Sequence, residues 1–138
     1  MKKIQFILAL LAGAFLAPSA ALAAEGVSIR AILIRATNEK RPSDPRLKQY
    51  EAELQRNLVF SSFRFVNEAT GAVPTRGKAT LQLGGGHRVE LENEKGALRA
   101  TMLWKSGLSQ SVNVPRDGVR VFVNRVGDNA DAVLILAK

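Results

Sequence analysis

The chain contains no cysteine, and this absence excludes several kinds of protein at once. Disulfides, thiolate zinc sites, cysteine nucleophiles and thiol redox centres all require that residue. Small exported domains often depend on disulfides for their stability. A domain of this size without them must be held together by a packed core and by the hydrogen bonds of its sheets.

Histidine is nearly absent as well, since His87 is the only one in the sequence. A metal site needs several converging ligands, so any site here would depend mainly on carboxylates. Glu90, Glu92 and Glu94 alternate along one predicted strand, but a solvated face beside neighbouring basic residues explains this pattern more simply. We therefore expect neither a metal nor another cofactor.

The motifs that usually accompany catalysis are also missing. The sequence has no G-x-S-x-G element to present a nucleophilic serine. Gly84-Gly85-Gly86 is followed by a strand pattern and not by the Lys-Ser/Thr and helix of a phosphate loop, which favours a hairpin turn. The remaining catalytic alternative is an exported hydrolase that uses His87 with Glu90. The sequence thus favours a protein that is not an enzyme.

The N-terminus has the three parts of a secretory signal peptide. Met1 to Lys3 is basic, residues 4–16 form an apolar run, and Ala21 to Ala23 matches a small-x-small cleavage site. The run is shorter than the roughly 20 residues that a membrane span needs, and an uncleaved anchor is the alternative. We expect residues 1–23 to be removed near Ala23. This leaves 24–138 as a single exported β-rich domain, without a transmembrane segment, in the periplasm or the medium.

One amphipathic helix is predicted from Asp44, after a first strand at residues 27–36. Asp44 is placed to cap the helix, Pro45 suits its first position, and leucines recur at helical spacing as Leu47, Leu54 and Leu58. A Phe-rich strand follows at 60–66, and its phenylalanines are expected in the core. Turn-forming residues then fill 67–71.

The remainder of the chain is predicted to form short strands joined by turns. Apolar and polar residues alternate in each of these segments, with glycine, proline, asparagine or aspartate between them. The segments are 78–83, 87–92, 98–104, 108–114, 119–124 and 132–137. The expected fold class is α+β, mostly β. It is a curled antiparallel sheet or small β-sandwich of about 7–8 strands, with one helix after the first strand.

Three of these elements together resemble a pattern in small exported bacterial proteins without an assigned function. They are Asp44-Pro45-Arg46-Leu47 with its leucine-striped helix, Ser61-Ser62-Phe63-Arg64, and the Gly-rich hairpin. The resemblance implies an exported sheet-plus-helix domain and no catalytic residues that could be transferred to this sequence.

The formal net charge of +8 at pH 7 favours anionic partners. The basic residues are spread over many segments and form no local run, so a solvated basic surface is the simpler interpretation. If they do act together, the candidate contacts to an anionic partner are Arg64, Arg88, Arg99 and Arg120.

Two functions of different classes follow from these patterns. We expect a non-catalytic binding or interaction module that docks on another cell-envelope protein, with strand edges available to extend a partner's sheet. The alternative is a basic protein that binds anionic glycan, lipid or nucleic acid, of which nucleic acid is the least expected.

Overall fold

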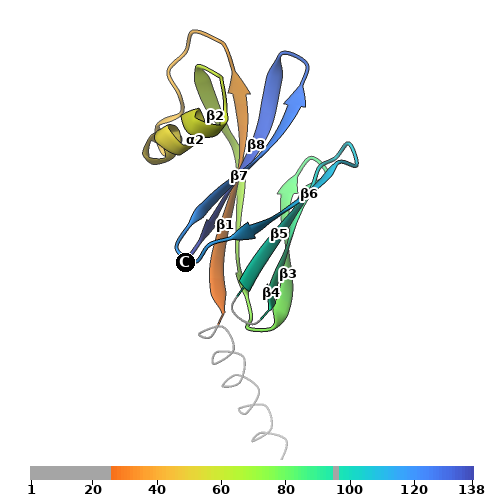
Figure 1. Ribbon diagram of the computed structural model, residues 1–138. Coiled ribbons are helices and arrows are strands. Elements are labelled where there is room, and N and C mark those ends of the chain that lie inside the picture. Colours follow the sequence, from red (N-terminus) through yellow and green to blue (C-terminus); the bar gives the residue numbers. More distant parts are fainter. Residues whose placement is uncertain (1–25, 95–96) are drawn as a thin grey trace, which may run out of the picture.

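Two four-stranded antiparallel sheets and one short helical segment make up residues 26–94 and 97–138, which this computed structural model describes (Figure 1). The predicted signal peptide, residues 1–23, lies outside the described residues. The fold class expected from the sequence, mostly β with a helix after the first strand, is confirmed. Sheet A has the strand order β2 (Ser62–Val73), β1 (Val27–Thr37), β8 (Asn129–Ala137), β7 (Val119–Val126). Sheet B has the order β3 (Gly77–Gly84), β4 (His87–Glu94), β5 (Ala97–Leu103), β6 (Ser109–Val114).

Sheet A is covered on both faces, because the helical segment lies on one side and sheet B on the other. Its central strands β1 and β8 are therefore apolar on both sides along residues 31–34 and 132–135. Ile32 and Ile34 belong to the core under the helix, whereas Leu33 belongs to the core between the sheets. All three are buried.

The helical segment begins as a 3₁₀ helix, η1 (Pro45–Tyr50), and continues as an α-helix, α2 (Glu51–Asn57). Asp44 caps it as predicted, since its Oδ1 accepts the backbone N–H of Arg46 at 3.0 Å. The hydrogen bonds from the Arg46 side chain and backbone lower the pKa of the Asp44 carboxyl to about 2. The leucine stripe is buried against sheet A: Leu47, Leu54 and Leu58.

The prediction of a turn at 67–71 is wrong, because β2 continues through these residues to Val73. Residues 67–73 pair with β1, and this long-range partner outweighs their turn-forming composition. The register with β1 shifts between Leu33 and Ile34, so Val66 is an extra residue in a β-bulge. The side chain of Val66 is half exposed.

The phenylalanines of this strand pack under the helix and not between the sheets. Phe63 is buried there, while Phe60 and Phe65 are partly buried at the rim of the same cluster. Each of the latter two carries an arginine over its ring: Arg46 at 4.1 Å from the Phe65 centroid and Arg125 at 5.6 Å from that of Phe60. The expected aromatic core is thus mainly Phe63.

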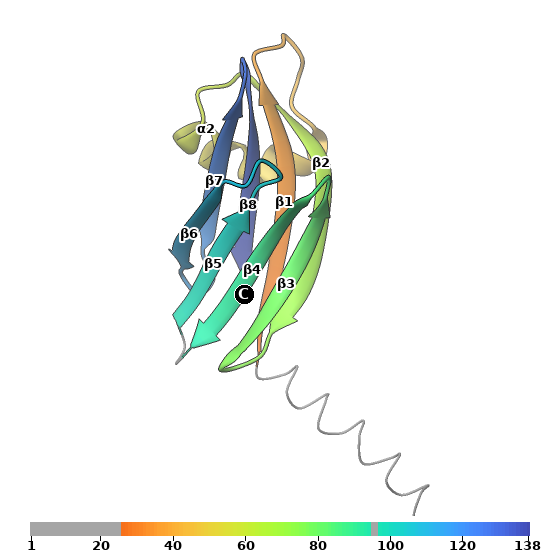
Figure 2. The same ribbon diagram turned by 90° about the vertical axis from the view of Figure 1, so that its right-hand side faces the viewer.

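The two sheets meet closely at one end of the molecule and diverge toward the other. At the first end, which we call the closed end, turns at 74–76 and 115–118 lead directly from one sheet to the other. The β3–β4, β5–β6 and β7–β8 turns lie at the opposite, open end (Figures 1 and 2). The predicted glycine hairpin is confirmed between β3 and β4, where Gly84, Gly85 and Gly86 all have positive φ angles.

Candidate interaction surface at the open end

A cleft of about 300 Å³ lies between sheet A and the β3–β4 hairpin at the open end. Its base is apolar, because Leu33 and Leu83 come from the core between the sheets. Polar side chains stand above this base on both walls. The remaining lining residues are Arg35, Val66, Asn67, Gly84, Gly85, His87 and Asp131.

The charges inside the cleft neutralise each other. Arg35 donates from Nε to Asp131 Oδ1 at 3.0 Å, and Asp131 is only 7% exposed. The arginine compensates the carboxylate for its burial, which would be costly without a partner. Arg64 is opposite Arg35 in the register of β1 and β2, but its guanidinium lies 3.7 Å from Glu39 and lines a separate hollow. The cleft therefore offers no unbalanced charge.

His87 is held in the wall of the cleft by contacts of its own. Its Nδ1 accepts the backbone N–H of Lys105 at 3.0 Å, and its ring meets Trp104 edge-on at 5.4 Å. Glu90, the partner considered for a hydrolase, is exposed on the opposite face of β4, where Arg88 lies 3.8 Å away. The structure does not bring His87 and Glu90 together.

The sheets adjoin along two seams, β2 beside β3 and β6 beside β7, and no backbone ladder is formed across either in the described residues. Each seam is instead bridged by one amide side chain. Asn67 Nδ2 donates to the carbonyl of Leu83 at 2.8 Å, and Gln110 Nε2 donates to that of Val123 at 3.2 Å. Gln110 Oε1 also accepts Nε1–H of the buried Trp104 at 2.8 Å.

The two edge strands of sheet A differ in how well they are covered. On β2, the carbonyl of Phe63 accepts the N–H of Asp44 at 3.0 Å, and its own N–H donates to Ser43 Oγ at 3.0 Å. On β7, the hydrogen bonds to groups outside the sheet are the Gln110 bridge and that of Arg120, whose Nε donates to the carbonyl of Asn113 at 3.1 Å. The edge of β7 is thus the more open one.

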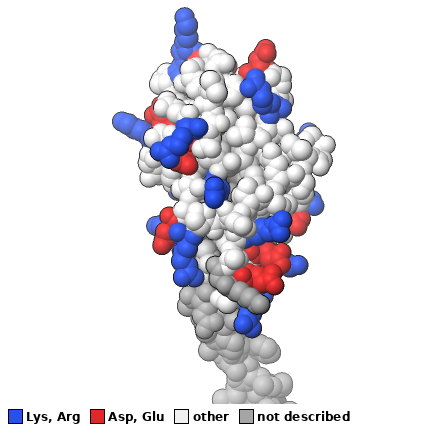
Figure 3. Space-filling view, viewed as in Figure 1, with Lys and Arg blue, Asp and Glu red and all other residues white. Residues whose placement is uncertain are grey.

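Three exposed apolar side chains border the open end. Val66 lies in the bulge of β2, Leu108 in the β5–β6 turn and Val126 at the end of β7, and they are 50%, 45% and 49% exposed. A fourth, Val59, is 94% exposed but belongs to the connection between α2 and β2. Figure 3 shows that the face carrying α2, β7 and β6 is largely uncharged over its centre.

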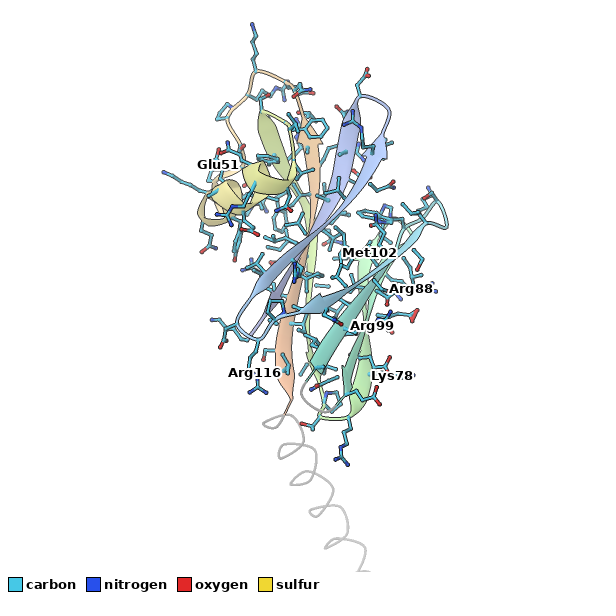
Figure 4. The ribbon with its side chains drawn as sticks, viewed as in Figure 1. Glu51, Lys78, Arg88, Arg99, Met102 and Arg116 are labelled. Carbon is cyan, nitrogen blue, oxygen red and sulfur yellow. The ribbon has the colours of Figure 1, made fainter. Side chains whose placement is uncertain are left out.

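The four candidate arginines are distributed over both sheets. Arg88 and Arg99 lie on the outer face of sheet B (Figure 4), where Arg99 is opposite Glu92 in the register of β4 and β5. Arg64 and Arg120 belong to the edge strands β2 and β7 of sheet A. The basic and acidic side chains visible in Figure 3 are likewise interspersed and form no single basic area on that face.

A second hollow, of about 470 Å³, lies beside the helix on the outer face of sheet A. Its arginine is already engaged, since Arg30 donates to the nearby Glu68 at 2.6 Å and to the Tyr50 hydroxyl at 3.4 Å. No group of three or more potential metal-ligating side chains gathers anywhere in 26–94 and 97–138. The same part of the chain contains no helix with the length and apolar character needed to cross a bilayer.

Sequence reasoning missed the residues that define this surface, above all Asn67, Gln110 and Val126. An amide that bridges two sheets has no distinctive local pattern, and Val126 was the last apolar residue before a turn. Comparison of the chain with protein-family models, curated proteins and solved structures found no match. The function is therefore inferred from the surface itself.

Proposed function

We propose that this protein is an exported, non-catalytic interaction module that docks on another protein of the cell envelope through its open end. The observation that carries the proposal is an open cleft lined by half-exposed Val66, with two further half-exposed apolar side chains, Leu108 and Val126, at the same end of the molecule. Exposed apolar groups gathered around a concavity are typical of protein-binding surfaces. The predicted signal peptide supports export.

The arrangement of charge favours this function over binding to an anionic surface. Arg88 and Arg99 share the outer face of sheet B with three glutamates: Glu90, Glu92 and Glu94. Such a balanced face attracts a polyanion weakly, because steering by charge requires a field of one sign.

The proposal is tested by capture from envelope extract with the immobilised chain. We expect one defined protein to be retained and to be lost when Val66 and Leu108 are both replaced by lysine. Val59→Lys is the control for an added lysine at an exposed valine in the connection between α2 and β2; it adds one charge, against two in the double variant. Recovery of lipid or glycan alone, or a capture that falls steeply as salt rises, would favour the anionic-surface alternative.

A further inference from the structure

The backbone of β7 presents a row of hydrogen-bonding groups to the open seam. The carbonyl of Val123 accepts from Gln110 across this seam, so the backbone groups of Val123 point away from β8. The carbonyl of Gly118 accepts the N–H of Ala137, so the even-numbered positions point toward β8. Because direction alternates along an antiparallel strand, Val121 and Arg125 also point outward.

These outward groups lack protein partners in the part of the chain that the structure describes. No hydrogen bond is found there for the outward N–H or C=O of Val121 or Arg125, and Val123 has only the Gln110 bridge. The corresponding edge of β2 is occupied at Phe63 by bonds from Ser43 and Asp44. Open strand edges pair readily with other chains unless they are covered, so β7 is available for such pairing, whereas β2 is blocked at Phe63.

The side chains along β7 indicate what kind of strand would fit. Val121 and Val123 are partly buried on the helix side, and Phe122 is buried between the sheets. Two exposed arginines stand at either end of this apolar stretch, Arg120 and Arg125. Cross-strand neighbours pair apolar with apolar and positive with negative charge.

We propose that the β7 edge binds an extended strand of the partner protein that is apolar in its centre and acidic at its ends. The inference rests on the proposed docking function and assigns it a place and a partner chemistry. The incoming strand replaces the single bond from Gln110 to Val123 with a series of backbone bonds at the outward positions. The exposed side chains of Leu108 and Val126 flank the entrance to the seam between β6 and β7.

The experiment uses the full chain and a blocked hexapeptide with a glutamate at each end and alternating valine and threonine between them, because Arg120 and Arg125 lie on opposite faces of β7. Amide hydrogen exchange is followed by NMR with and without the peptide. We expect exchange at Val121, Val123 and Arg125 to slow by about tenfold or more at saturation, with no change at Phe63. A peptide with lysine in place of both glutamates should bind about tenfold more weakly, equivalent to roughly 1.4 kcal/mol.

A double variant, Arg120→Gln with Arg125→Gln, isolates the contribution of charge. It should abolish the preference for the glutamate-ended peptide while leaving the slow exchange of the β8 amides unchanged. Arg99→Gln, on the outer face of sheet B, is the matched control and should preserve the preference.

Three results would overturn the inference: no protection of β7 by the peptide, protection at the β2 edge instead, or self-association of the pure chain through β7. Each is distinguishable from failure of the proposed function. If envelope extract yields a partner whose capture depends on Val66 and Leu108 while β7 stays unprotected, docking stands and strand pairing falls. If no partner is captured while the peptide protects β7, the β7 edge binds a strand but the proposed docking through Val66 and Leu108 is wrong.

Discussion

The two edge strands of sheet A are covered to different extents. The chain covers β2 with the segment that precedes the helix, using Ser43, Asp44 and Arg46. On β7, which has no such segment, one amide bridge and one arginine reach across the seam. The backbone N–H and C=O groups on the outer side of β7 are therefore left available to a partner strand. The predictions below test whether this asymmetry is real and what maintains it.

The largest expected effect comes from detaching the helical segment that covers β2. Leu54 is fully buried against sheet A, so Leu54→Ala should lower the free energy of unfolding by about 2–5 kcal/mol, measured by urea denaturation. Amide exchange at Phe63 should accelerate, because its covering segment is released, while exchange at Val123 should change less.

Leu108→Ala is the control for that comparison, since Leu108 is 45% exposed at the open end. It should change the free energy of unfolding by no more than about 0.5 kcal/mol. Equal losses in the two variants would show that the helix contributes little to the cover of β2.

The two amide bridges should differ in strength. Gln110→Ala removes the bonds to both Val123 and Trp104 and leaves a buried indole N–H without a partner, at a cost of about 1–3 kcal/mol. Asn67→Ala should cost less, about 1 kcal/mol, because the exposed side of that seam lets water replace the amide.

Thermal or urea denaturation measures both changes, with Gln82→Ala as the matched control at an exposed glutamine of β3. Its effect should stay within about 0.5 kcal/mol. If Gln110→Ala lowers the free energy of unfolding no more than Gln82→Ala does, the Gln110 bridge does not stabilise the β6–β7 seam. The two seams would then not differ in the strength of their bridges in the way proposed.

The cap at Asp44 should make the cover of β2 sensitive to acid. Its pKa is about 2 in the folded protein, whereas an unfolded aspartate titrates near 3.9. A lowered pKa contributes stability that is fully present above about pH 4 and is lost as the pH falls toward 2. Asp44→Ala should therefore lower the free energy of unfolding more at pH 7 than at pH 2.

Urea denaturation at the two pH values gives this difference directly. Asp44→Asn retains a capping oxygen without the charge, so it should cost less than Asp44→Ala at pH 7. If Asp44→Ala lowers the free energy of unfolding by the same amount at both pH values, the stability that Asp44 contributes does not depend on the charge of its carboxyl.

The sequence predicted those parts of the fold that depend on local pattern. Alternation identified the strands, the leucine spacing identified the helix face, and the Asp44-Pro45 pair identified its start. Residues 67–71 were misread because their pairing with β1 is set by a strand more than thirty residues away, which no local pattern contains.

The candidate surface was harder to predict for the same reason. Whether a strand edge is open or covered depends on the order of strands in its sheet. In the order β2-β1-β8-β7, the first strand pairs with the last, which no local pattern predicts. The candidate arginines were identified by residue type alone. Their positions on two sheets depend on that same order, although Arg120 does lie on the open edge.

The smallest expected effect on stability compares two arginines that each lie over a phenylalanine ring, one beside β2 and the other on β7. Arg46 lies over Phe65 at 4.1 Å and donates to both carboxylate oxygens of Asp44, whereas Arg125 lies over Phe60 at 5.6 Å. Arg46→Gln should lower the free energy of unfolding more than Arg125→Gln does, because an exposed cation–π contact and an ion pair are lost together. Arg125→Gln should cost less than about 0.5 kcal/mol by the same measurement. An equal cost in the two variants would mean that β7 is bound as firmly to its surroundings as β2. In that case the open edge would not be available to a partner strand.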